Sequence, residues 1–199
     1  MIKEYLKMVV VLTLIAMVCG FLLSAVKTLT HEKIEQQILV NVKGPALNNV
    51  LSQSTNNPID DRMNIELEGI TYTVFIGKKE DRLYAVAFES EGNGFGGKIG
   101  IMIGIDIEKS SISGIGILTH QETPGLGSRI SEMSFTDRFK GKFLSDNFKV
   151  KKDSGDIDAI SGATNSSRGV CSAVESGVEL YSKLKAEILI KIDKGSEEQ

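Results

Sequence analysis

The feature that most constrains the fold is an uncharged apolar stretch near the start of the chain, residues 8–26. As a helix rising 1.5 Å per residue it would span about 28 Å, close to the hydrocarbon thickness of a bilayer. It is also longer than the apolar region of about 7 to 15 residues that most cleaved signal peptides contain. We therefore predict a transmembrane helix over 8–26. A cleaved signal peptide and a lipid-modified Cys19 are the competing interpretations.

Charge sets the expected orientation of this helix. Lys3 and Lys7 precede it, offset only by Glu4, whereas a single lysine, Lys27, follows it closely. Because basic flanks stay in the cytoplasm, we expect residues 1–7 to be cytoplasmic, the helix to cross the cell (inner) membrane once, and the rest of the chain to be extracytoplasmic. Beyond the helix acidic residues outnumber basic ones. The part of the chain beyond the helix is therefore acidic overall, and it contains no cluster of basic and aromatic residues. Both observations argue against nucleic acid as a partner.

Residues 27–68 are expected to form a helical stalk and a loop next to the membrane. Apolar residues recur at helical spacing over 28–53, with an interruption at Gly44 and Pro45. The stretch 51–68 is polar and rich in turn residues, which predicts a loop. The helical part either holds the following domain at a fixed height above the membrane or simply packs on that domain.

Strand patterns dominate the centre of the chain. Alternating apolar and polar residues predict four antiparallel strands, over 70–76, 83–89, 98–107 and 112–118. The glycine-rich segment 92–97 is followed by a strand and not by a helix, which excludes a dinucleotide-binding fold. This segment is either a loop that passes close to a ligand or another backbone, or a mobile connector.

Two helical patterns follow the strands. Apolar residues at three- and four-residue steps from Arg168 onward predict a long amphipathic helix that covers the sheet. A shorter amphipathic helix is expected over 128–140, with Met133, Phe135 and Phe139 in the core. The predicted fold class is α+β, with an antiparallel sheet packed against helices over 69–190 and a charged tail over 191–199. Three lysines between the helices, at 149, 151 and 152, form a solvated face or meet an acidic partner.

The residues just before the long helix are the candidates for chemistry. The segment 158–167 combines small side chains, hydroxyl groups, an aspartate and a glycine. We expect Thr164 to lie just before the helix, with Asn165, Ser166 or Ser167 as the N-cap. A helix N-terminus beside a glycine favours a phosphate, through its free N–H groups and its dipole. From spacing alone, this segment is either a hydroxyl beside an anion site or an ordinary loop with a serine-rich cap.

Other catalytic chemistries lack the residues that they need. The chain has two histidines, His31 and His120, and two cysteines, Cys19 and Cys171. Metal-ligand spacings, a nucleophile elbow and a zinc-protease motif are all missing from the sequence. We therefore expect no metal site, no structural disulfide, and no independent hydrolase or transferase. Cys171 is either a small buried hydrophobe or a reactive thiol.

Two motifs resemble those of the FMN-binding subunits of the Rnf and Nqr respiratory complexes. The first is Ser-Gly-Ala-Thr at 161–164, with Asp158 three residues before its serine. In that family the final threonine carries FMN through a phosphoester bond. The resemblance implies that Thr164 holds covalent FMN and that a flavin transferase installs it. The residues that this transferase would read are Asp158, Ser161, Gly162 and Ala163.

The second motif lies at 120–127 and is similar to the family's His-x-Glu-Thr-Pro-Gly-Leu-Gly segment. By this resemblance Glu122, Thr123 and Leu126 help to line the flavin pocket. The short chain, with one anchor and a compact domain, is more similar to the G subunit of the Rnf complex than to the C subunit of the Nqr complex.

The resemblance implies a subunit of an ion-translocating oxidoreductase of the ferredoxin:NAD+ type. Electrons would pass through the FMN and the partner subunits A to E, coupled to Na⁺ or H⁺ translocation. A covalent tether keeps FMN from diffusing away while leaving its ring free to react. The alternatives are an Nqr-type C subunit or a standalone extracytoplasmic electron carrier. Two further alternatives bind no flavin: a membrane-anchored structural tether and a domain that binds a solute reversibly.

Overall fold

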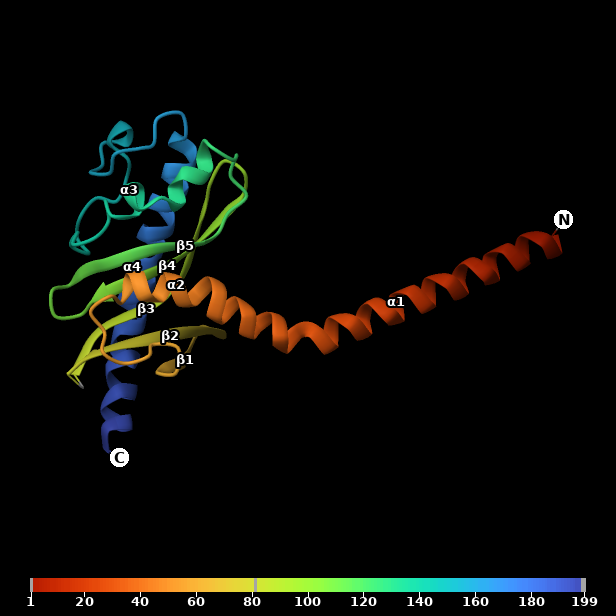
Figure 1. Ribbon diagram of the computed structural model, residues 1–199, viewed down its shortest axis with the longest axis horizontal. Coiled ribbons are helices and arrows are strands. Elements are labelled where there is room, and N and C mark those ends of the chain that lie inside the picture. The colour runs from red at the N-terminus through yellow and green to blue at the C-terminus, as the bar shows by residue number, and fades with distance from the viewer. Residues whose placement is uncertain (1, 81, 198–199) are drawn as a thin grey trace. The chain divides into compact units, whose positions relative to one another are not determined.

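The computed structural model describes residues 2–80 and 82–197, in two compact units, one reaching Asn41 and one starting at Val42 (Figure 1). Helix α1 (Ile2–Ile38) makes up most of the first unit. Within the described residues one helical stretch, Ile2–Val50, is long and apolar enough to cross a membrane, judged by length and composition alone. The predicted membrane helix lies inside this stretch. Its large apolar side chains are exposed, as is typical of side chains that face lipid.

The helical run changes its geometry after α1. Leu39–Lys43 forms a π-helix, and α2 (Gly44–Val50) follows with Pro45 in its first turn. Proline is well placed there, because the N–H that it lacks has no partner in the first turn of a helix. The predicted interruption at Gly44 and Pro45 is therefore a change of helix type and not a loop.

Five antiparallel strands form one sheet in the order β1-β2-β3-β4-β5, which confirms the predicted α+β class. The strands are β1 (Arg62–Leu67), β2 (Ile70–Lys79), β3 (Arg82–Asn93), β4 (Lys98–Asp106) and β5 (Ser111–Thr119). The four predicted strands correspond to β2 through β5. The predicted loop over 51–68 is wrong where it includes β1, which pairs with β2 along its whole length.

Helices cover both faces of this sheet. Neighbouring residues of a strand point to opposite faces. In β4, Ile103 lies against Gly177 of helix α4 (Thr164–Glu197), whereas the next residue, Gly104, lies against Val50 of α2. Figure 1 shows the same arrangement, with α4 in blue behind the sheet and α2 in orange in front of it.

The main core lies between the sheet and α4. The predicted apolar face of the helix is buried there, through Val170, Ala173, Val174, Tyr181, Leu184 and Ile188. Cys171 belongs to the same core, and burial, with the nearby acidic groups, raises the pKa of its thiol to about 12. Because Cys171 is buried in this core, the interpretation as a small buried hydrophobe is confirmed, and a thiol with that pKa holds little thiolate near neutral pH.

The segment after β5 differs from its prediction. In place of one helix over 128–140, the chain forms a 3-10 helix (Gly127–Ser131) and the single turn α3 (Met133–Thr136). Glu132 between them has an extended backbone, with ψ 142°, which breaks the helix. Phe135 and Phe139 are buried with their rings edge to face, but Met133 is 66% exposed, so its assignment to the core is wrong.

One end of the sheet positions the site. The β3–β4 loop and the segment after β5 leave the sheet at the same end, because Asn93 pairs with Lys98 and Gly100 with Thr119. The first turns of α4 pack against that loop. From there α4 runs to Glu197, through most of the predicted tail; residues 1, 198 and 199 of the predicted terminal segments lie outside the described residues.

Candidate functional site

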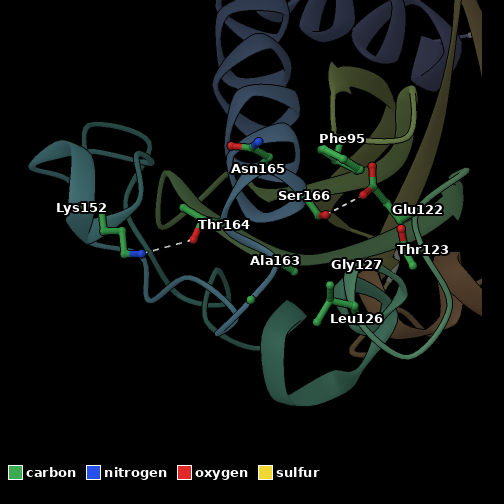
Figure 2. A pocket seen from close by; sticks show the side chains of 11 residues that line it. Phe95, Glu122, Thr123, Leu126, Gly127, Lys152, Ala163, Thr164, Asn165 and Ser166 are labelled. Carbon is green, nitrogen blue, oxygen red and sulfur yellow. Dashed lines mark hydrogen bonds between the residues drawn. The ribbon is translucent and has the colours of Figure 1, made fainter.

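A pocket of about 350 Å³ opens where α4 begins (Figure 2). This volume lies within the range of about 300 to 1,000 Å³ that is usual for small-molecule sites. Four segments form its wall: the β3–β4 loop, the segment after β5, the loop that carries Lys152, and the first residues of α4 with the turn just before them. The lining residues are Phe95, Glu122, Thr123, Leu126, Gly127, Lys152, Gly162, Ala163, Thr164, Asn165 and Ser166.

Helix α4 begins at Thr164 itself, not after it as the sequence pattern predicts. The carbonyl of Ala163 accepts a helical hydrogen bond from the N–H of Ser167 at 3.0 Å. The prediction of Asn165, Ser166 or Ser167 as N-cap is therefore wrong, since all three lie in the first turn. Thr164 is half-buried in the pocket wall, at the helix end where backbone N–H groups favour an anion.

The turn before the helix is fixed by two features. The buried Ser167 Oγ donates to the carbonyl of Ala163 and accepts from the N–H of Ile160, both at 3.0 Å. Gly162 has φ +81°, in the left-handed region that favours glycine, and a Cβ atom there would lie 2.9 Å from Leu126 Cδ1. The turn thus favours glycine at this position of the motif, whereas the exposed end of Leu126 could move aside for a larger residue.

Glu122 is a buried carboxylate that ties three walls of the pocket together. Its Oε2 accepts from Ser166 Oγ at 2.5 Å, as Figure 2 shows, and its Oε1 accepts from the N–H of Gly96 at 3.0 Å. Only 5% of the residue is exposed. A buried carboxylate is stable when hydrogen bonds satisfy its oxygens. These two bonds link the segment after β5 to α4 and to the β3–β4 loop.

Two apolar side chains give the pocket a surface suited to a flat ring. Phe95, from the β3–β4 loop, is 72% exposed, and Leu126, from the segment after β5, is 45% exposed. Figure 2 shows that they come from different segments of the pocket wall. Exposed apolar area of this kind is stabilised when an aromatic ligand covers it.

Two residues of the predicted motif lie outside the pocket lining. Ser161 is exposed, and so is Asp158, whose Oδ2 accepts from Lys151 Nζ at 2.9 Å. That hydrogen bond from Lys151 holds the pKa of Asp158 below its usual value. Both side chains are therefore accessible on the surface of the loop that leads to Thr164.

The pocket also contains residues that the sequence did not single out for it, namely Phe95, Gly127 and Lys152. Phe95 could have been found from the sequence, since it is the one large side chain in the glycine-rich segment 92–97. That segment lines the pocket and contacts the backbone of α4, as the first of its two interpretations predicts. No sequence pattern points to Lys152, because it comes close to Thr164 only when its loop is folded.

Comparison with known proteins identifies the family. The FMN-binding domain family matches residues 94–179, a range that includes every residue lining the pocket. The chain is 30% identical to the G subunit of the ion-translocating oxidoreductase complex of Shewanella amazonensis, over 93% of this chain and 92% of that protein. The G subunit of the same name from Pasteurella multocida is 33% identical, over 89% and 94%. The chain belongs to this family of G subunits. The predicted resemblance to the G subunits is thereby confirmed.

The fold of this G-subunit family member is also found in a solved structure. The C subunit of the Na⁺-translocating NADH-quinone reductase from Parabacteroides distasonis superposes with a TM-score of 0.58, over 76% of this chain and 95% of that chain. The identity is 23%, so the likeness establishes a shared fold and no more.

Proposed function

We propose that this chain is the subunit of a membrane-bound ion-translocating oxidoreductase, of the ferredoxin:NAD+ type, that carries FMN covalently on Thr164 and relays electrons through it. The observation that carries the proposal is the place of Thr164, which is the first residue of α4, in the pocket wall of an FMN-binding domain. FMN, when bound, supplies the electron transfer through its isoalloxazine ring.

The residues of the pocket fit the two chemically different parts of FMN. At one side the start of α4 favours a phosphate beside Thr164 Oγ1. At the other side Phe95 and Leu126 offer apolar area for the ring. Glu122 has both oxygens engaged by protein donors, so we assign it to the support of the pocket and not to proton transfer.

Attachment is a phosphoryl transfer to the threonine hydroxyl. Thr164 Oγ1 forms the new bond to the flavin-side phosphorus of a flavin dinucleotide, the bond from that phosphorus to the bridging oxygen breaks, a nucleoside monophosphate leaves, and the hydroxyl proton passes to a base of the enzyme that catalyses the transfer. We assign this step to a flavin transferase. The exposed side chains of Asp158 and Ser161 are accessible to such an enzyme, while Gly162 and Ala163 give the loop its turn.

The same proposal includes a place in the cell and a division of the chain. Residues 8–26 would anchor it in the cell membrane, with 1–7 in the cytoplasm, and the helical segment after the anchor would lead to an extracytoplasmic FMN-binding domain that includes α2 and β1 as well as the predicted range 69–190. Partner subunits A to E would exchange electrons with it. The whole complex, and not this chain alone, would couple electron flow to movement of Na⁺ or H⁺.

The test is intact mass and peptide mapping of the protein from its native host, with Thr164→Ala and the pocket-rim variant Thr123→Ala alongside. We expect an FMN-phosphoryl increment on the Thr164 peptide that survives denaturation. It should vanish in Thr164→Ala and persist in Thr123→Ala. An unmodified Thr164 in a host with an active flavin transferase would contradict the proposal and favour a non-redox membrane tether.

A further inference from the structure

We propose that Lys152 is the counter-ion of the phosphodiester on Thr164, a positioning residue that holds the phosphoryl group at the edge of the pocket. The inference rests on the proposed covalent FMN. It goes beyond that proposal because it assigns a role to a side chain outside both sequence motifs.

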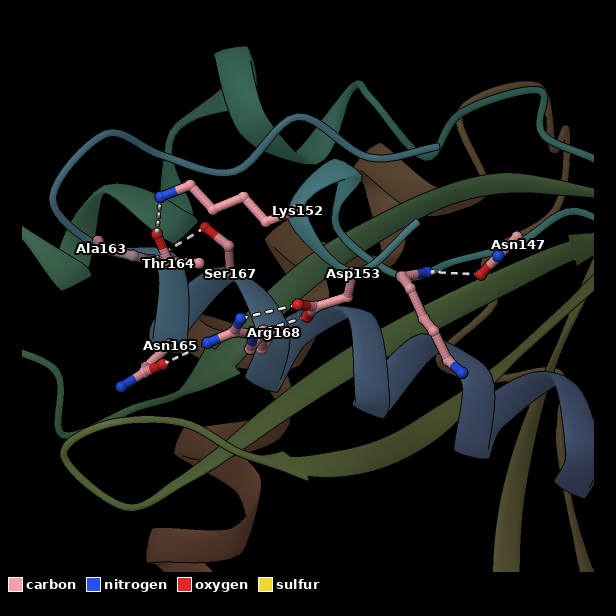
Figure 3. A network of polar contacts seen from close by, with 9 residues as sticks. Asn147, Lys152, Asp153, Ala163, Thr164, Asn165, Ser167 and Arg168 are labelled. Carbon is pink, nitrogen blue, oxygen red and sulfur yellow. Dashed lines mark hydrogen bonds and ion pairs between the residues drawn. The ribbon is translucent and has the colours of Figure 1, made fainter. Parts of the chain in front are cut away.

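Lys152 reaches Thr164 from a different part of the chain. It lies in the 3-10 helix Lys151–Asp153, and its Nζ is 3.5 Å from Thr164 Oγ1. Figure 3 shows the side chain extended toward the threonine hydroxyl. Among the described residues, Lys152 is the one basic side chain that lines the pocket.

The charges next to Lys152 are already neutralised. Lys151 donates to Asp158, and Asp153 accepts two hydrogen bonds from Arg168, at 2.6 and 2.8 Å. Of the three consecutive charged residues, the outer two therefore have partners of opposite charge. Lys152, in the middle, forms no ion pair within the part of the chain that the structure describes.

The loop that carries Lys152 is closed on itself. Val150 and Ile157 form a parallel bridge, and Asn147 Nδ2 donates to the carbonyl of Ser154 at 3.0 Å. The ion pair between Asp153 and Arg168 joins this loop to the first turns of α4, as Figure 3 shows. The base of the lysine side chain is therefore fixed relative to the helix end that carries the threonine.

A phosphodiester on Thr164 would place one negative charge next to this ammonium group. A lysine acts on phosphate as a compact point charge with three donors, so the contact tolerates small changes of geometry. Lys152 is exposed, and solvent screens the attraction. Exposed ion pairs change an equilibrium by roughly 1.5-fold to 5-fold, and we expect an effect of that size.

The experiment compares Lys152→Gln with Lys149→Gln in the full-length protein, produced together with the flavin transferase. Lys149 is also exposed and lies on the same loop, but it does not line the pocket, so its variant removes the same charge from outside the site. The readouts are the ³¹P resonance of the phosphodiester and, at limiting transferase, the fraction of Thr164 that is modified. Thermal unfolding of the unmodified proteins checks that the loop variants fold alike.

We expect Lys152→Gln to shift the ³¹P resonance and to lower the modified fraction roughly 1.5-fold to 5-fold. Lys149→Gln should leave both at the wild-type value, and Lys152→Arg should restore most of the modification. If Thr164 is modified and the two glutamine variants give the same resonance and yield, the role of Lys152 is overturned while the covalent FMN stands. If the wild-type protein itself carries no flavin, the proposed function fails first.

Discussion

At the scale of single residues, Gly162 connects the backbone of the attachment loop to the pocket wall. Its φ of +81° lies in the left-handed region, where a residue with a side chain is less stable than glycine by about 1 to 2 kcal/mol. A side chain there would also press on Leu126 Cδ1, at 2.9 Å. Gly141 has nearly the same backbone, with φ +79°, but nothing lies within 4 Å of the place where its Cβ would be. These two glycines separate backbone strain from side-chain contact.

We predict that Gly162→Ala and Gly141→Ala lower the free energy of unfolding by similar amounts. Each should lose about 1 to 2 kcal/mol from backbone strain, because Leu126 is 45% exposed and its Cδ1 can move aside. Urea unfolding of the full-length protein in detergent measures both. A clearly larger loss for Gly162→Ala, partly restored by Leu126→Ala, would show that the Leu126 side chain is held in place.

The residues of the site were predictable to different degrees. Thr164 and Gly162 could be singled out because their motif is continuous in the sequence, and Glu122 because a second continuous motif contains it. The structure places all three around one pocket, while their roles toward FMN stay predictions. Lys152 was not predictable, because no periodicity relates it to a threonine twelve positions later. Its position depends on hydrogen bonds that close the loop.

At the scale of elements, the crossing of α4 over the end of β3 is unusually close. A Cβ atom on Gly169 would lie 2.7 Å from Gly94 Cα and 2.8 Å from the carbonyl of Asn93, both backbone atoms. A Cβ atom on Gly177, further along the same helix, would meet side-chain atoms instead: Ile103 Cγ2 at 3.0 Å and Ser90 Cβ at 3.4 Å. Backbone atoms of a packed loop cannot move aside as a side chain can.

We therefore predict different outcomes for two alanine substitutions in α4. Alanine is favoured over glycine inside a helix by about 1 kcal/mol. In Gly177→Ala this gain should offset the small shift of Ile103, so the midpoint of thermal unfolding should change little. In Gly169→Ala the overlap with the β3–β4 loop should prevail and destabilise the protein by about 1 to 3 kcal/mol. If Gly169→Ala is as stable as Gly177→Ala, the crossing is looser than described.

The elements that the sequence did not predict have identifiable causes. In β1 the apolar residues Met63, Ile65 and Leu67 do alternate, but the strand is only six residues long and follows a segment full of turn residues. Over 128–140 the apolar spacing fits a helix, yet the extended backbone at Glu132 divides it. Periodicity identifies the side chains that suit a face, and it does not reveal where the backbone leaves a regular conformation.

At the scale of the whole molecule, the proposed orientation can be tested with single cysteines. In a Cys19→Ser background, Ser145→Cys places an exposed thiol in the domain, and Lys3→Cys places one before the anchor. The natural Cys171 can stay, because burial raises its pKa to about 12 and leaves little thiolate to react. We expect a membrane-impermeant maleimide to label Ser145→Cys on intact cells and Lys3→Cys only after permeabilisation. The reverse pattern would contradict an extracytoplasmic domain.

The order of the strands also has a consequence for the timing of maturation. Every strand of the sheet pairs with its neighbour in sequence, so each hairpin can form while later parts of the chain are still being synthesised. Helix α4 is the final element, and it supplies both Thr164 and the contacts that close the pocket. The pocket around Thr164 is therefore complete only after the start of α4 has packed against the preformed sheet. A flavin on Thr164 would mark a molecule in which this last packing step had already taken place.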